Sequence, residues 1–307
     1  MKRISQISVY IIIIILAALN FISSPVALIL GFLFTLVLGH PFPVQSKRAI
    51  QILLKISIIG LGFGMSVIET IKASKEGFVI TALSIFITIG LGLLLIKVLK
   101  IDKKLGFLMT SGTSICGGSA IAAISPVIKA NPKTISIAIG IVFLLNSIAL
   151  LIFPSLGHLF HLSQTQFGTW CAIAIHDTSS VVGAALEYGD QALQIATTVK
   201  LARTLWIIPL SFFAMALFKS KNQKIKIPYF ILGFIAAMLI NSYHLIPELV
   251  SLRLVDISKR LLIITLFLVG ASLSVKDIKE TGFKPILFST ILWVFISVFS
   301  LVFIINF

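Results

Sequence analysis

Charged residues are scarce in this chain, and acidic residues are the scarcest of them. Asp, Glu, Lys and Arg make up 11% of the 307 residues, about half of their share in a typical soluble domain. Only 10 residues are acidic, whereas 58% are hydrophobic, and the mean hydropathy is +1.12. Such a composition excludes the hydrated surface of a soluble enzyme, so we expect a membrane protein.

Motifs for catalysis, nucleotide binding and metal binding are also missing. The sequence contains no GxxxxGK[ST] phosphate loop, no HExxH zinc motif and no GxSxG nucleophile motif. Its two cysteines, Cys116 and Cys171, lie in apolar stretches without the spacing of a zinc site. We therefore predict no enzymatic activity, no cofactor and no metal, and expect any transport to be driven by an ion gradient or by the substrate's own gradient.

Long apolar runs dominate what the sequence does contain. A spanning helix needs about 20 consecutive, mostly apolar residues, and nine runs bounded by charge, Pro or Gly fit this pattern. We predict an all-α polytopic membrane protein with a single transmembrane domain over residues 1–307. The predicted spanning helices cover residues 8–22, 26–39, 49–68, 78–98, 134–153, 195–218, 228–242, 256–275 and 283–306.

Two further apolar segments, 107–128 and 169–187, are interrupted by small and polar residues. The interruptions are Ser-Gly-Thr-Ser-Ile-Cys-Gly-Gly-Ser at 111–119 and His-Asp-Thr-Ser-Ser at 176–180. Irregular backbone is tolerated in a membrane only where protein buries it or water lines it. We predict two broken helices, either re-entrant hairpins, which we favour, or full crossings. The competing interpretation is that the glycines only allow close helix packing.

The positive charges indicate an orientation. The net charge of +15 would suggest nucleic acid in a soluble protein, but lysines and arginines concentrated in cytoplasmic loops explain it without such a partner. Lysines at 103–104 and at 129 and 133 place both ends of the first broken segment inside. The second is flanked by 154–168, which has no Lys or Arg, and by acidic residues. We predict a cytoplasmic N-terminus and two hairpins that point at each other.

An internal repeat divides the chain. The sequence Ile-Leu-Gly-Phe at 29–32 recurs at 231–234, and 62–69 parallels 270–277. In the predicted topology the early copies start outside and the late copies start inside, so the repeat is inverted. The halves are 26–153 and 169–306, with helix 8–22 as an addition. Inverted repeats with discontinuous helices are typical of secondary transporters, which bind substrate near the membrane midplane.

The broken segments and the helices after them supply the candidate substrate site. Free main-chain N–H groups at a half-helix start can bind an anion, and two cations on one helical turn can face the same anion. Asn146 is the repeat counterpart of Arg203. An alternative is that Lys200 and Arg203 snorkel to the outer interface. The predicted substrate-binding residues are Ser111, Gly112, Thr113, Ser114, Cys116, Gly117, Gly118, Ser119, Asn146, Thr178, Ser179, Ser180, Lys200 and Arg203.

His176 and Asp177 are candidates for ion coupling. Asp177 is the one acidic residue predicted deep in the membrane, and ionisable residues there are functional candidates by default. It could bind Na+ or a proton, or it could cap the helix that begins at Thr178. His176 could take part in a proton relay because histidine titrates near neutral pH, or it could be a buried structural histidine.

The stretches 111–123 and 176–184 together resemble the YeiH-type family of bacterial membrane proteins. The glycines at 60, 62 and 64 and the segment 200–203 also fit the pattern of that family, and the resemblance covers nearly the whole chain. The family is usually called sulfate exporters and is grouped with the cation:proton antiporter and anion transporter superfamily. The resemblance implies an inverted-repeat carrier in the bacterial inner membrane.

These observations lead to one expected function and two alternatives. We expect a secondary transporter for a small anion, such as sulfate, a sulfonate or a carboxylate, working by alternating access at the two breaks. The first alternative is a cation:proton antiporter that uses Asp177 and His176. The second is a membrane assembly or receptor subunit that transports nothing. We expect the protein to lie in the lipid bilayer. We also expect a homo-oligomer, because carriers of this kind often keep one bundle as a static scaffold.

Overall fold

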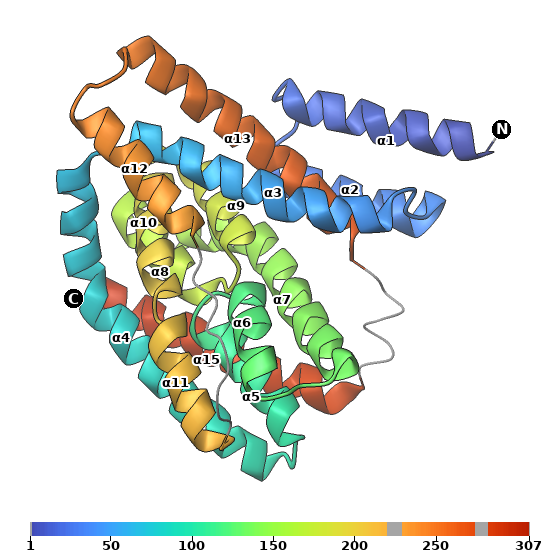
Figure 1. Ribbon diagram of the computed structural model, residues 1–307, viewed down its shortest axis with the longest axis vertical. Helices are drawn as coiled ribbons and strands as arrows, with labels where there is room; N and C mark the ends of the chain where they lie inside the picture. Colours follow the sequence, from blue (N-terminus) through green and yellow to red (C-terminus); the bar gives the residue numbers. More distant parts are fainter. Residues whose placement is uncertain (1, 220–228, 274–281, 307) are drawn as a thin grey trace.

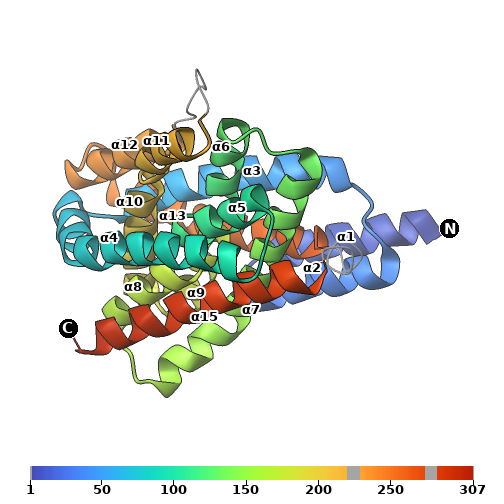
Figure 2. The ribbon, with the colours of Figure 1, turned by 90° about the horizontal axis from the view of Figure 1, so that it is seen from below.

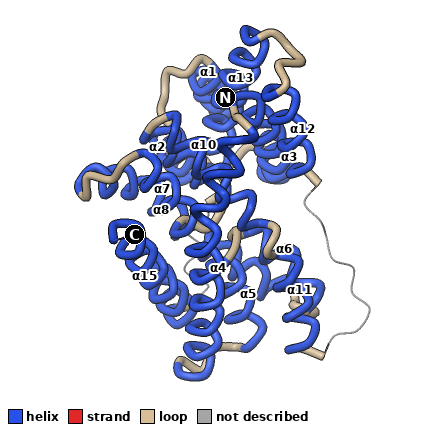
Figure 3. The backbone as a smooth tube through the Cα atoms, turned by 90° about the vertical axis from the view of Figure 1, so that its left-hand side faces the viewer, coloured by secondary structure: helices blue, strands red, loops and turns tan. Residues whose placement is uncertain are grey.

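The computed structural model describes residues 2–219, 229–273 and 282–306, and these ranges contain helices and no strand (Figure 3). The predicted all-α class is therefore confirmed for the described residues. By length and composition, four helical segments can cross a membrane: Phe78–Val98, Pro132–Leu159, Asp190–Leu217 and Phe283–Asn306. The end of the second repeat copy, 274–277, lies outside the described residues.

The helices form two groups, of which the first lies at the top of Figure 1. We call it the panel. Its members come from both ends of the chain: α2 packs against α13, and α3 packs against both α12 and α13. The panel consists of α1 (Lys2–Ala18), α2 (Ser24–Leu38), α3 (Pro43–Leu61), the short 3-10 helix η1 (Gly62–Gly64), α12 (Phe230–Ser242) and α13 (Glu248–Ala271).

The second group, which we call the hairpin bundle, fills the lower part of Figure 1. Figure 2 shows α4 and α15 running side by side along one face of it, and both also contact α5 and α8. The hairpin bundle consists of α4 (Val67–Val98), α5 (Lys103–Ser114), α6 (Gly118–Val127), α7 (Pro132–Leu159), α8 (Gln164–Ala174), α9 (Thr178–Tyr188), α10 (Asp190–Thr204), α11 (Ile207–Leu217) and α15 (Phe283–Asn306).

Glycines let the panel helices α2 and α13 cross with their backbones in contact. A Cβ atom added to Gly31 would lie 2.1 Å from the main-chain oxygen of Phe267, and one added to Gly270 would lie 2.0 Å from that of Leu28. Thr35 Oγ1 also donates a 2.8 Å hydrogen bond to the main-chain oxygen of Ala271. Small residues permit this close approach in membrane proteins.

A second crossing, between α3–η1 and α12, uses the glycines at the equivalent repeat positions. A Cβ atom added to Gly233 would lie 2.8 Å from Ile59 Cδ1, and one added to Gly62 would lie 2.7 Å from the main-chain oxygen of Phe234. Each early repeat helix therefore packs against a late one. The pairing explains why the glycines at 31 and 62 recur at 233 and 270.

The first interrupted segment folds back on itself. Helix α5 ends at Ser114 and α6 begins at Gly118. At the open end of this pair, Lys104 Nζ donates a 2.8 Å hydrogen bond to the main-chain oxygen of Lys129. Helices that crossed the protein in succession would place these two residues at opposite ends, so α5 and α6 form a hairpin.

The second interrupted segment has the same geometry. Helix α8 ends at Ala174 and α9 begins at Thr178. The hydroxyl of Tyr188, at the end of α9, donates a 2.6 Å hydrogen bond to the main-chain oxygen of Leu162, just before α8. Helices α8 and α9 thus form a second hairpin.

Several predicted boundaries were wrong. The interruptions are shorter than predicted, because only 115–117 and 175–177 are non-helical, and both sides of each continue as helix. The helix predicted at 195–218 begins at Asp190 and is interrupted at 205–206, between α10 and α11. The first helix ends at Ala18 rather than at residue 22.

Candidate functional site

The tips of the two hairpins touch each other. Gly117 has a φ of +60°, which a glycine adopts without strain. A Cβ atom added to it would lie 3.2 Å from Asp177 Cβ and 3.2 Å from the main-chain nitrogen of Asp177. The peptide turns at 115–117 and 175–177 therefore meet in the interior.

Asp177 caps the start of α9, as one of the two predicted interpretations required. Its Oδ2 accepts hydrogen bonds from the main-chain nitrogen of Ser180, at 3.2 Å, and from the hydroxyl of Ser179. The other carboxylate oxygen, Oδ1, is buried and has no hydrogen-bond partner within the described residues. The cap uses Oδ2 of Asp177 as its acceptor and leaves Oδ1 able to accept a further hydrogen bond.

Arg203 on α10 binds the end of the first hairpin's leading helix. Its side chain is 0% exposed, and Nε and Nη2 donate to the main-chain oxygen of Ser114 at 2.9 and 2.6 Å. Ser114 is the last residue of α5, where the helix dipole concentrates partial negative charge. The remaining nitrogen, Nη1, has no partner in the described part of the chain.

Lys200, one turn earlier on α10, binds the end of the second hairpin's leading helix. It is also 0% exposed, and Nζ donates to the main-chain oxygens of Ile175 and Ala172 at 2.7 and 3.2 Å. The interpretation that Lys200 and Arg203 snorkel to the interface is therefore wrong. Sequence reasoning missed these carbonyl partners, although two cations beside two predicted helix ends were a usable signal.

Asn146 on α7, the helix after the first hairpin, contacts the tip of the second hairpin. Its Oδ1 accepts a 2.9 Å hydrogen bond from the main-chain nitrogen of His176, at the tip of the second hairpin. The helix that follows the first hairpin thus holds the second tip, while Arg203, on the helix that follows the second hairpin, holds the first tip at Ser114. The predicted counterparts therefore contact opposite tips.

Unpartnered polar atoms gather around these contacts. Among the described residues, eleven buried side-chain nitrogen and oxygen atoms have no hydrogen-bond partner. Six of them belong to five residues of the tips and the flanking helices. A buried polar group without a partner is costly, and an accumulation of such groups requires an explanation. The six atoms are Thr113 Oγ1, Asn146 Nδ2, His176 Nδ1 and Nε2, Asp177 Oδ1 and Arg203 Nη1.

The other predicted site residues have mainly structural contacts. The hydroxyls of Ser111 and Ser114 bond to main-chain oxygens of their own helix. Gly112 packs against Ile121 and Val142. Ser119 is exposed, whereas the remaining predicted residues Cys116, Thr178 and Ser180 are buried and Gly118 is half-buried.

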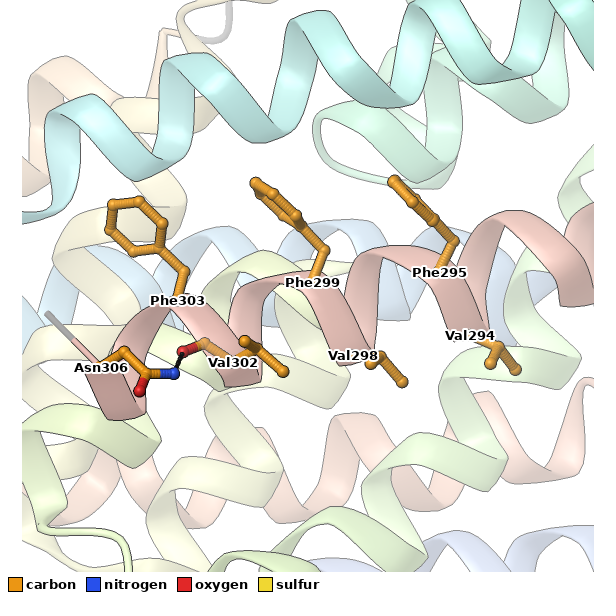
Figure 4. A pocket seen from close by; sticks show the side chains of 7 residues that line it. All are labelled: Val294, Phe295, Val298, Phe299, Val302, Phe303 and Asn306. Atoms are coloured by element: carbon orange, nitrogen blue, oxygen red, sulfur yellow. Dashed lines mark hydrogen bonds between the residues drawn. The ribbon is translucent and has the colours of Figure 1, made fainter.

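The neighbouring helix α15 carries an apolar groove on its outer side (Figure 4). Phenylalanines at 295, 299 and 303 and valines at 294, 298 and 302 line it. Its one polar lining residue, Asn306, bonds to the main-chain oxygen of Val302 in its own helix. The groove therefore offers nothing that would select an anion.

Known proteins resemble this chain over most of its length. The family model described as "Conserved hypothetical protein 698" matches residues 4–289. The chain belongs to this family. A UPF0324 membrane protein of Photobacterium profundum is 51% identical over 96% of this chain and 90% of its own length. A relative in Bacteroides thetaiotaomicron is 48% identical over 92% of this chain and 86% of its own length. One in Geobacter sulfurreducens is 42% identical over 94% of this chain and 92% of its own length.

The names of the relatives agree with the apolar helices of this chain. These relatives are named UPF0324 membrane proteins, and the chain has helices that can cross a membrane. The resemblance read from the sequence is confirmed, and this family member is a membrane protein with transmembrane helices. No solved structure matches the chain. Within the described residues, no group of three or more His, Cys, Asp and Glu side chains could hold a metal ion.

Proposed function

We propose that this protein is a secondary transporter that carries a small anion, bound where the two hairpin tips meet. The observation that carries the proposal is that six unpartnered polar atoms belong to five residues of the tips and flanking helices. One of these residues, Arg203, is a fully buried cation, as is Lys200. An anion supplies acceptors for Arg203 Nη1 and Asn146 Nδ2. Because those donors lie in a desolvated interior, their hydrogen bonds to a charged ligand are stronger than in water.

The balance of charge favours an anion. In their ordinary charge states Lys200 and Arg203 bring two positive charges and Asp177 one negative charge. All three side chains are buried, so in these states the tips would have one positive charge in excess. The main-chain oxygens that bind the cations carry only partial charge. A buried charge without a full counter-charge is costly, and a bound anion removes this cost.

Access to this site requires helices to separate. His176, Asp177, Asn146 and Arg203 are at most 7% exposed, so no ligand reaches them while the surrounding packing holds. Helix α9 of the hairpin bundle packs against α13 and α2 of the panel. On α10, Gln194 Nε2 donates a 3.2 Å hydrogen bond to the main-chain oxygen of Gly64 in η1. We propose that the hairpin bundle moves against the panel and opens the tips to one side of the membrane at a time.

The proposed topology keeps the predicted nine spans, two re-entrant hairpins and two inverted halves, 26–153 and 169–306. The paired glycine crossings and the reciprocal contacts of Asn146 and Arg203 support it, because a two-fold relation between the halves generates both. The predicted orientation places the N-terminus in the cytoplasm of a bacterium and the protein in the inner membrane. We also propose that the protein forms a homo-oligomer.

The predicted alternative is a cation:proton antiporter that uses Asp177 and His176. It required Lys200 or Arg203 to neutralise Asp177, yet the ion pairs of the described residues are Lys259–Asp190 and Arg260–Asp256. A cation approaching Asp177 would also meet the field of both buried cations. The anion carrier is therefore the better-supported function.

Counterflow in proteoliposomes tests the proposal. Vesicles loaded with sulfate, methanesulfonate, acetate or NaCl of equal osmolarity are diluted into the labelled form of the same solute. We expect labelled anion to accumulate transiently, and Arg203→Lys, which keeps the charge but removes the guanidinium fork, to reduce the rate at least tenfold. Arg260→Lys, at the surface of α13, is the matched control. Flux that follows Na+ alone would establish the antiporter, and no counterflow with any solute would leave only a non-transporting subunit.

A further inference from the structure

His176 is a titratable residue whose imidazole has no hydrogen-bond partner in the described part of the chain. Its side chain is 0% exposed, and neither ring nitrogen has a partner among the described residues. Its main chain is fixed, because the nitrogen donates to Asn146 Oδ1. The imidazole therefore has a fixed place at the tip but two unused nitrogens, and only the protonated ring can donate from both of them.

The charged groups around His176 come from few elements. Helix α10 contributes Lys200, which donates to the main-chain oxygen of the preceding residue Ile175, and Arg203, which donates to the main-chain oxygen of Ser114 in the other tip. Asp177 follows it in the chain and is occupied in capping α9. The thiols of Cys116 in the first tip and Cys171 on α8 are uncharged in their ordinary state. Helices α2, α7 and α13 also pack against α9. Helix α2 has no titratable residue, and α7 carries Lys133 and His158 near its two ends. The titratable residues of α13 are Glu248, Arg253, Asp256, Lys259 and Arg260.

The protonation state of His176 determines how much negative charge on a ligand the site can balance. With a neutral imidazole, the tips hold one excess positive charge, which balances a monovalent anion. With a protonated imidazole they hold two, which balance a divalent anion. In the empty site a proton on His176 would be a third positive charge beside Lys200 and Arg203, whereas a bound dianion offsets it.

We infer that His176 takes up a proton when the site binds a divalent oxyanion, so that dianion and proton occupy the hairpin tips together. A monovalent oxyanion binds to the same donors without a proton. The inference rests on the proposed anion carrier and adds the charge of its ligand and the residue that adjusts to it. Proton uptake becomes part of ligand binding because the same interior must balance both charges.

Proton uptake during binding is the direct measurement. Purified protein in weak buffer with a pH indicator, at about pH 7.5, where a free histidine is mostly neutral, is titrated with sulfate or with methanesulfonate. We expect uptake of one proton for each sulfate bound and no uptake with methanesulfonate. Isothermal titration calorimetry in two buffers of different ionisation enthalpy measures the same quantity independently and also gives the affinity.

Variants identify the group that takes the proton. His176→Gln retains hydrogen-bonding capacity but does not titrate, so we expect its sulfate binding to proceed without proton uptake. His158→Gln, in the last turn of α7, should take up the proton as the wild type does. Lys200→Arg removes the other nearby group that could exchange a proton, because arginine stays charged at every pH used. Uptake lost in Lys200→Arg and retained in His176→Gln would assign the proton to Lys200 and overturn the inference.

Wild-type protein alone also gives a test should a variant fail to fold. Above neutral pH, sulfate affinity should fall about tenfold per pH unit if one proton accompanies binding, while methanesulfonate affinity should not change. Sulfate binding without proton uptake, or binding of methanesulfonate alone, would overturn the inference and leave the anion carrier intact. Failure of every anion to bind would overturn the carrier itself, and the inference with it.

Discussion

Arg203 donates two hydrogen bonds to a single acceptor, the main-chain oxygen of Ser114, although the two residues lie 89 positions apart. The contact joins the helix after the second hairpin to the first hairpin's tip. The guanidinium has five N–H donors, and those used here leave Nη1 without a partner in the described part of the chain. Arg203 therefore both fixes the tip and retains a donor for a ligand.

Gly117 should be indispensable for the contact between the tips. Gly117→Ala places a Cβ atom 3.2 Å from Asp177 and forces a non-glycine residue into positive φ, at a cost of about 1–3 kcal/mol. We expect a lower thermal unfolding midpoint and weaker anion binding, measured by differential scanning fluorimetry with and without sulfate. Gly140→Ala is the control, because no atom lies within 4 Å of its added Cβ and alanine favours the helix. Equal midpoints for both variants would contradict the assigned role of Gly117.

Two substitutions of Asp177 should separate its cap from its charge. Asparagine caps helices about as well as aspartate, so Asp177→Asn should keep the wild-type stability. Asp177→Ala loses the bonds to Ser179 and Ser180 and should lose about 1 kcal/mol. Because Asp177→Asn also removes a negative charge from the tips, we expect tighter sulfate binding by calorimetry. Loss of sulfate binding in Asp177→Asn together with loss of a Na+ response would favour the antiporter.

The crossing of α2 and α13 should tolerate no added methyl group. In Gly31→Ala the new Cβ would meet the main-chain oxygen of Phe267 at 2.1 Å, so the helices must separate, and overpacking of this kind typically costs about 1–3 kcal/mol. Gly90→Ala in α4 has open space around its Cβ and should be neutral. Thermal unfolding in detergent distinguishes them, and an unaffected Gly31→Ala would show that the crossing is looser than described.

Labelling of introduced cysteines should place the ends of α7 on opposite sides of the membrane. Asn131 and His161 flank this helix of 28 residues, which is about 42 Å long at 1.5 Å per residue. In intact cells we expect Asn131→Cys to react only with a permeant maleimide and His161→Cys also with an impermeant one. The native Cys116 and Cys171 are buried and give the background. Reaction of Asn131→Cys with the impermeant reagent would contradict the orientation.

The prediction of two hairpins came from the distribution of lysines along the chain. Lysines on both sides of the first break and none on one side of the second favoured hairpins over crossings. Lys104 and Lys129 are in contact, whereas re-entry on one side of the membrane stays a prediction. The cap at Asp177 followed from an acidic residue before three hydroxyl residues. The capping pattern lies within residues 177–180, whereas the lysines that flank the first break span residues 103–133.

The sequence placed two cations near two predicted helix ends, but which main-chain oxygens they bind could not be predicted, because those oxygens carry no sequence signature. Lys200 and Arg203 bind the carbonyls of three residues, and only the folded arrangement of α5, α8 and α10 brings these together. The extent of the first break was wrong for a related reason. Gly112 packs against Ile121 and Val142, and this tertiary contact accompanies a helix that continues through a glycine that local propensity disfavours.

The pairing of α2 with α13 has a consequence for biosynthesis. Thr35 and its partner Ala271 lie 236 residues apart, and at ribosomal rates of about 5–20 residues per second that interval corresponds to roughly 10–50 seconds. During this time the glycine face of α2 has left the ribosome, but the helix that covers it has not been made. During synthesis the first half of the protein therefore lies in the membrane with the glycine face of α2 uncovered. Lipid, the insertion machinery or a transiently bound protein must cover that face until α13 is made.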